Sequence, residues 1–318
     1  MTSLLGIDQD LLYVIGSVTG ALVLVTCVGL ILERKVTGER ACSTVSNMNA
    51  RIHAWWVMCI LFGIALLTGG TGSIVFFGLV SFLAMREFVT LIPTRRSDHR
   101  TLLWIFYVIT PLQYWLVAIK RYDLFSVLIP LYAFLFVPIR TSLAGDPERF
   151  LDRTSNIQWG LTVCVYCVSH VPALLSLNIP DYGGQNLKLV VFLVLVAESS
   201  DVLQYVWGKW LGKRPIAPHI SPNKTWEGFI GGVGCATLIG TSVWWLTPFT
   251  PWQAAGLSLA IALMGFAGGL TMSAIKRDRG VKDYGTLING HGGVLDRIDS
   301  ICFAAPVFFH VTRYLVAV

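Results

Sequence analysis

The sequence predicts an all-α protein, a polytopic transmembrane helical bundle of about 10 spans. Hydrophobic residues make up 54% of the 318 positions, charged residues only 13%, and the mean hydropathy is +0.66. A soluble domain carries about 25% charged residues, so this chain has too few charges to cover a water-facing surface. Composition, long apolar runs and the one-sided placement of basic residues therefore all predict a membrane protein.

The apolar runs set the expected order of elements, because a membrane-spanning helix needs about 20 apolar residues. Ten segments are candidates for such helices: 11–32, 54–68, 71–92, 101–119, 124–140, 157–177, 187–207, 227–246, 253–272 and 300–317. Only the glycine-rich stretch around 69–72 separates the second and third candidates, which predicts a tight helical hairpin there.

Basic residues indicate which connecting segments face the cytoplasm. With the N-terminus placed outside, all of the 24 lysines and arginines fall on the inner side except Lys120, Arg121, Lys188 and Arg313. This asymmetry follows the positive-inside rule and predicts an even number of spans. The formal net charge of +6 is then explained by topology, and no nucleic-acid partner is expected.

The inner segment after the seventh span, residues 208–227, is dense in polar groups. Asp201 ends the apolar span before it, and an ionisable residue in such a place predicts a functional site. Ser221, Lys224, Thr225 and Glu227 follow, in a pattern typical of a helix N-terminus. Either the free amides and Lys224 bind a phosphate, or the helix is simply capped; the residues alone leave both open.

The inner segment at 273–299 gathers cations, carboxylates and glycines within 27 residues. Lysine and arginine side chains hold phosphate oxygens, and aspartates hold Mg²⁺, which prefers one or two carboxylates plus substrate phosphates. The candidate catalytic residues are Lys276, Arg277, Lys282, Asp283, His291, Asp296, Arg297 and Asp299. The candidate substrate-binding residues are Asp201, Ser221, Lys224, Thr225, Glu227, Ser273, Gly292 and Gly293. The candidate Mg²⁺ ligands are Asp296, Asp283 and Asp299.

The stretch from Ser273 to Asp299 resembles the signature of the phosphatidate cytidylyltransferase (CDP-diacylglycerol synthase) family. That signature reads Ser-x-x-Lys-Arg, four residues, Lys-Asp, and then His-Gly-Gly-x-x-Asp-Arg-x-Asp, and every position is filled here. The resemblance covers about residues 190–318 well and extends upstream only as a hydrophobic pattern. It implies an N-terminal transmembrane region, 1–156, with about five spans, and a C-terminal transmembrane catalytic region, 157–318.

The resemblance also implies a reaction: CTP and phosphatidate, or a similar lipid phosphate, give a CDP-lipid and pyrophosphate. It implies Mg²⁺ and a possible second cation, an inner or cytoplasmic membrane, a cytoplasm-facing site and a possible homodimer. The family usually has acidic residues at the positions of Gly269 and Met272, which favours a diverged member acting on a different lipid phosphate. A membrane transporter is the alternative of another class, but its charged residues would be spread through several spans.

Overall fold

The computed structural model describes residues 9–35, 39–180, 182–287 and 292–317. Within them the chain is almost entirely helical, which confirms the all-α prediction. The helices are α1 (Gln9–Lys35), α2 (Glu39–Leu67), α3 (Gly69–Leu91), α4 (His99–Trp104), α5 (Thr110–Ala118), α6 (Tyr122–Val127), α7 (Phe134–Ser142), α8 (Phe150–Leu161), α9 (Val168–Ala173), α10 (Leu187–Leu211), α11 (Trp226–Ser242), α12 (Pro251–Asp278) and α13 (Leu295–Ala317). Wider helical turns at 105–109, 128–133 and 162–167 join α4 to α5, α6 to α7 and α8 to α9, so each pair forms one continuous rod.

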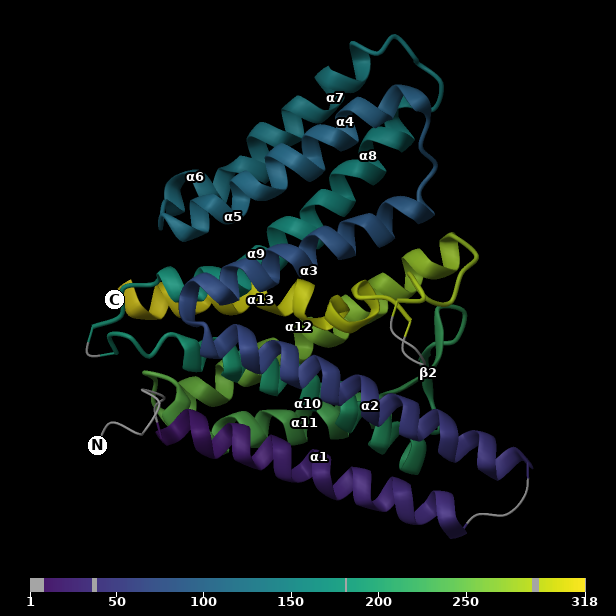
Figure 1. The fold of residues 1–318 in the computed structure, drawn as a ribbon, viewed down its shortest axis with the longest axis vertical. Helices are drawn as coiled ribbons and strands as arrows, with labels where there is room; N and C mark the ends of the chain where they lie inside the picture. The colour runs from purple at the N-terminus through teal and green to yellow at the C-terminus, as the bar shows by residue number, and fades with distance from the viewer. Residues whose placement is uncertain (1–8, 36–38, 181, 288–291, 318) are drawn as a thin grey trace.

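Eight helical stretches among the described residues are long and apolar enough to cross a membrane. They are Gln9–Lys35, Met48–Leu67, Gly69–Leu91, Arg96–Ala118, Tyr122–Ser142, Phe150–Ser176, Leu187–Leu211 and Pro251–Asp278. The two other expected spans correspond to α11 and α13. Helix α11 has 17 residues and carries Glu227 in its first turn, and α13 carries Asp296 in its first turn. They too run between the two ends of the bundle, so that α1 begins and α13 finishes at the same end (Figure 1). An even number of crossings places them in this way.

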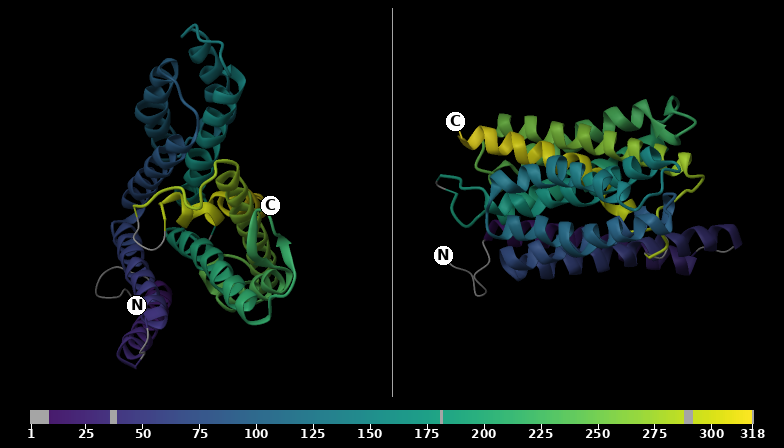
Figure 2. Two further views of the ribbon diagram at one scale, coloured as in Figure 1. Left: turned by 90° about the vertical axis from the view of Figure 1, so that its right-hand side faces the viewer. Right: turned by 90° about the horizontal axis from the view of Figure 1, so that it is seen from above.

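Successive helices fold into three groups. Figure 2 shows the α1–α2 hairpin, the α4–α8 rods and the α10–α12 helices meeting around α3 and α13. The α2–α3 turn is as tight as predicted, because α2 ends at Leu67 and α3 begins at Gly69. Helix α3 packs against α5, α9 and α13, and therefore joins the N-terminal half of the chain to the helix that ends it.

A short antiparallel hairpin lies between α10 and α11 (Figure 1). Its strands are β1 (Pro215–Ala217) and β2 (Ser221–Thr225). The helix N-terminus predicted in this stretch lies at its end: α11 begins at Trp226, with Glu227 in its first turn, while Ser221 belongs to β2. Thr225 is the N-cap of α11, with the side chain accepting a hydrogen bond from the Gly228 N–H.

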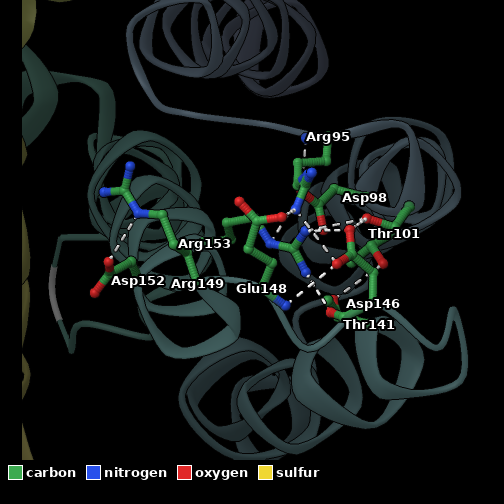
Figure 3. A network of polar contacts seen from close by, with 10 residues as sticks. Arg95, Asp98, Thr101, Thr141, Asp146, Glu148, Arg149, Asp152 and Arg153 are labelled. Atoms are coloured by element: carbon green, nitrogen blue, oxygen red, sulfur yellow. Dashed lines mark hydrogen bonds and ion pairs between the residues drawn. The ribbon is translucent and has the colours of Figure 1, made fainter.

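A buried ion network joins the connecting segments of the α4–α8 group (Figure 3). The Arg153 side chain is 1% exposed. It donates hydrogen bonds to Asp146 Oδ2 and to the backbone carbonyl oxygen of Asp146, both at 2.8 Å. Arg153 Nε also lies 3.6 Å from the fully buried Asp98 carboxylate, and Arg95 pairs with Asp146 and Glu148. These contacts connect the segment before α4 with the segment between α7 and α8 and with α8 itself.

Candidate active site

A cavity of about 650 Å³ opens at the end of the bundle where α10, α12 and α13 meet their connecting loops. Its walls come from α2, α10, the loop after α12 and the first turns of α13. The lining residues are Arg51, Trp55, Glu198, Asp201, Val202, Tyr205, Lys282, Asp283, Gly285, Thr286, Gly292, Asp296, Arg297 and Asp299. The site is therefore assembled from segments nearly 250 residues apart, and both signs of charge face the same space.

The predicted site residues divide between this cavity and its supports. Seven of them line the cavity: Asp201, Lys282, Asp283, Gly292, Asp296, Arg297 and Asp299. Eight do not: Ser221, Lys224, Thr225, Glu227, Ser273, Lys276, Arg277 and Gly293. His291 lies outside the described residues.

Asp296 is held in place through both of its carboxylate oxygens. Oδ1 accepts a hydrogen bond from Lys276 Nζ at 2.8 Å, in an ion pair whose side chains are 12% and 2% exposed. Oδ2 accepts from the backbone amides of Tyr284 at 2.8 Å and Gly293 at 2.9 Å. Asp296 thus ties α12, the loop after it and α13 together, and Lys276 is bound to it rather than directed into the cavity.

A second acidic group joins α10 to α13. The Ser300 hydroxyl hydrogen-bonds Asp201 Oδ2 and lies 3.3 Å from Asp299 Oδ1, which also accepts from the Ser300 amide at 2.9 Å. Glu198 lines the same cavity one helical turn before Asp201. Three carboxylates in one partly enclosed space repel one another unless a cation lies among them or one of them is protonated.

Lys224 is a cation close to the Asp201 and Asp299 carboxylates. Its ammonium lies 4.9 Å from the centre of the Phe266 ring. Burial lowers the pKa of Lys224, while the neighbouring carboxylates of Asp201 and Asp299 act in the opposite direction. Lys224 Nζ is also 2.7 Å from the point where a Cβ at Gly269 would be, so this glycine leaves the room that the ammonium uses.

The remaining predicted residues outside the cavity have local partners. Glu227 accepts hydrogen bonds from the amides of Lys213 at 3.1 Å and Arg214 at 3.2 Å, which closes the turn from α10 into β1. Arg277 donates to the carbonyl oxygens of Ile220 and Val281, both at 3.2 Å, and so fastens the β-hairpin to the end of α12. The Ser273 hydroxyl donates to the Gly269 carbonyl within its own helix at 2.6 Å. These contacts hold up the walls of the site.

Several cavity residues were absent from the sequence prediction. Arg51 and Trp55, on α2, were not among the predicted site residues, and only the tertiary structure places them at the cavity. Tyr205 and Thr286 also line it without having been chosen. Glu198 could have been predicted from the sequence, because it lies in an apolar run, the same feature that predicted Asp201 as a site residue.

The donor set of the cavity fits Mg²⁺. This ion takes one or two carboxylates and completes its shell with phosphate and water oxygens. Asp201 and Asp299, bridged by Ser300, provide such a pair, whereas both Asp296 oxygens already have protein partners. Among the described residues, no three His, Cys, Asp or Glu side chains form a cluster suited to a metal ion on their own.

Comparison with known proteins places these features in context. A family model described as the cytidylyltransferase family matches residues 49–315. YnbB, an uncharacterized protein of Escherichia coli K12, is 43% identical over 271 residues, which cover 84% of this chain and 88% of YnbB. Phosphatidate cytidylyltransferases of Mycobacterium leprae and a Synechocystis species are 37% and 43% identical over 170 and 141 residues, or 53% and 44% of this chain. The matched stretches span about half the length of these two enzymes, 53% and 48%.

Proposed function

The chain belongs to the cytidylyltransferase family, and on that premise we propose that it transfers the cytidylyl group of CTP to phosphatidate. The products are CDP-diacylglycerol and pyrophosphate. The chain is a membrane-embedded nucleotidyltransferase. The observation that supports the substrate pair best is the cavity itself, where the acidic residues Asp201 and Asp299 face the cations Lys282 and Arg297 at the end of a bundle of lipid-facing helices.

The reaction needs positioning and charge neutralisation more than covalent chemistry from the protein. An oxygen of the lipid phosphate attacks the α-phosphorus of CTP, and the bond from that phosphorus to the bridging oxygen breaks as pyrophosphate leaves. No general base is required, because the attacking phosphate is already ionised. The protein's task is to hold two polyanions in line and to offset their charge.

In this proposal the acidic residues of the cavity hold the metal ion and its basic residues bind phosphate oxygens. Asp201 and Asp299 would hold Mg²⁺, which neutralises the triphosphate when bound. Lys282 is exposed at the cavity wall, and the Nε of Arg297 is buried without a hydrogen-bond partner among the described residues. We assign both cations to phosphate oxygens, which would give Arg297 Nε the acceptor that it lacks among the described residues.

Transfer to another lipid phosphate is the second candidate, and Gly269 favours it. The family's usual acidic side chain is missing at this position, and the Lys224 ammonium lies beside the space that it leaves. The balance of charge near Asp299 is therefore more positive than the resemblance implies. A polyprenyl phosphate belongs in the test beside phosphatidate for this reason.

The purified protein, supplied with CTP, Mg²⁺ and a panel of lipid phosphates, should release pyrophosphate and form a CDP-lipid. Asp299→Asn should lower the rate by roughly 100-fold or more, because one of the two carboxylates that would hold Mg²⁺ loses its charge. Asp152→Asn is the matched control, since Asp152 is an exposed partner of Arg149 and does not line the cavity. The lipid that gives the highest kcat/KM identifies the substrate.

Absence of a CDP-lipid with every acceptor, together with CTP flux through reconstituted vesicles, would instead favour the transporter. We also expect the cavity to face the cytoplasm, where CTP is found. Sealed inside-out vesicles should then use external CTP and right-side-out vesicles should not; the reverse result contradicts this orientation.

A further inference from the structure

We propose that Glu87, on α3, is a positioning residue that fixes the start of α13 and the loop before it, and thereby the geometry of Asp296 and Asp299. This role rests on the proposed function, since it concerns the same site. Glu87 does not line the cavity, so it does not meet the substrates. It acts through the backbone of the segment that carries the acidic residues.

The contact is made through both oxygens of the Glu87 carboxylate. Oε1 accepts a hydrogen bond from the Val294 amide and Oε2 from the Leu295 amide, each at 2.9 Å. Helix α13 begins at Leu295, and the first amides of a helix have no acceptor within the helix itself. A carboxylate at this end satisfies them and also interacts favourably with the helix dipole. Glu87 thus caps α13 from a helix more than 200 residues earlier.

Two glycines enclose this carboxylate. A Cβ at Gly285 would lie 2.9 Å from Glu87 Oε1, and a Cβ at Gly293 would lie 2.3 Å from Oε2. Both distances are shorter than a nonbonded contact allows, so any larger residue at either position would displace Glu87. Neither glycine has a positive φ, which makes close approach the reason for glycine at both positions.

The Glu87 contact is continuous with the one that holds Asp296. Three consecutive backbone amides donate to the two carboxylates. The Gly293 amide donates to Asp296 Oδ2, and the Val294 and Leu295 amides donate to Glu87. The next residue of α3, Phe88, stacks on the ring of Tyr284, whose amide is the other backbone donor to Asp296. Helix α3 therefore contacts the loop before Asp296 at two places, at Tyr284 and at Val294–Leu295.

Glu87→Gln tests this role with almost no change in side-chain volume. The amide keeps one acceptor oxygen and no charge, so one of the two backbone N–H groups loses its partner. We expect kcat for CTP-dependent pyrophosphate release to fall roughly 10- to 100-fold, as for other partners that orient a site, while the KM for CTP changes far less. Arg86→Gln is the matched control, because Arg86 is the adjacent residue, is exposed and does not line the cavity.

A paired substitution tests the steric part of the argument. Gly293→Ala should lower kcat, because its methyl group presses on the Glu87 carboxylate. Adding Glu87→Asp, which shortens that side chain by one methylene, should restore part of the lost activity. A double variant no more active than Gly293→Ala alone, or wild-type kcat in Glu87→Gln, overturns the proposal.

Hydrogen exchange separates failure of this inference from failure of the proposed function, because it needs no turnover. Peptides covering residues 292–299 should exchange faster in Glu87→Gln than in wild type, and at the wild-type rate in Arg86→Gln. If no CTP-dependent activity is found for any variant, faster exchange still supports the positioning role. Unchanged exchange contradicts it.

Discussion

Asp296 illustrates how a single residue in this site is specified by its surroundings. Its carboxylate accepts three hydrogen bonds, from Lys276 Nζ and from the amides of Tyr284 and Gly293. Charge-assisted hydrogen bonds of this kind are roughly twice as strong as neutral ones, so the side chain has one favoured orientation. The sequence motif identified Asp296 as important, but its contacts make it a structural anchor beside the Asp201–Asp299 pair.

Gly292→Ala should disturb this anchor. Gly292 has φ +83°, and a Cβ there would lie 2.6 Å from Asp296 Oδ2. The left-handed backbone costs an alanine about 1–2 kcal/mol, and the methyl group must also displace the carboxylate. We expect kcat for pyrophosphate release to fall roughly 10- to 100-fold.

Gly280→Ala is the matched control, because Gly280 has φ +68° but nothing within 4 Å of its Cβ position. It carries the same kind of backbone strain without the contact. Equal losses of activity in the two variants would attribute the effect to strain alone and exclude the role given to the Asp296 contact.

At the scale of elements, ion pairs between connecting segments hold the α4–α8 rods in register. Arg153 is buried at the start of α8 and is neutralised by Asp146 and Asp98, from the segments before α8 and before α4. Removing one partner of a buried charge leaves the other uncompensated, which is more costly than losing an exposed pair. The network therefore contributes to the stability of this group and takes no part in the cavity.

Asp146→Asn should lower the Tm at pH 7, and the effect should depend on pH. The hydrogen bond from Arg153 lowers the pKa of Asp146 below its ordinary value of 3.8. The stabilisation is therefore fully present above pH 3.8 and is lost as the pH falls through the lower, folded-state pKa. Thermal unfolding at pH 7 and at pH 3 should show the difference between wild type and variant shrinking at the lower pH.

Asp152→Asn provides the comparison, since Asp152 pairs with Arg149 while both side chains are more than half exposed. Its Tm should differ little from that of wild type at either pH. A pH-independent effect of Asp146→Asn would mean that packing, rather than the ion pair, is responsible.

At the scale of the whole molecule, the cavity takes its lining from helices far apart in the chain, α2, α10 and α13. Arg51 and Trp55 form the α2 wall, opposite Asp201 and Asp299. Arg51 is exposed and has no ion-pair partner among the described residues. An exposed cation on α2, whose stretch Met48–Leu67 is apolar enough to cross a membrane, suits a lipid phosphate more than a nucleotide.

Arg51→Gln should therefore raise the KM for the lipid phosphate about tenfold, the effect of about 1.4 kcal/mol, and leave the KM for CTP nearly unchanged. Initial rates with each substrate varied in turn measure both constants. Arg34→Gln is the control, since Arg34 is also exposed, near the end of α1, and does not line the cavity. A selective rise in the KM for CTP would assign Arg51 to the nucleotide instead.

The sequence by itself determined the membrane class and the order of the helices, and it predicted the segment for the candidate site. These properties are local: about 20 apolar residues suffice to specify a span, and the charged stretch at 273–299 is contiguous. It also marked Asp201 and Asp299, because a carboxylate in an apolar run is costly unless it has a partner.

Only the tertiary structure decided which of those residues share a cavity and which support it. Thr225 caps a helix, Arg277 fastens a hairpin, and Arg51 reaches the site from a distant helix. Each of these roles depends on contacts between segments far apart in the chain, such as that of Glu87 with Leu295, and such contacts arise from packing directions that no local pattern of residues encodes.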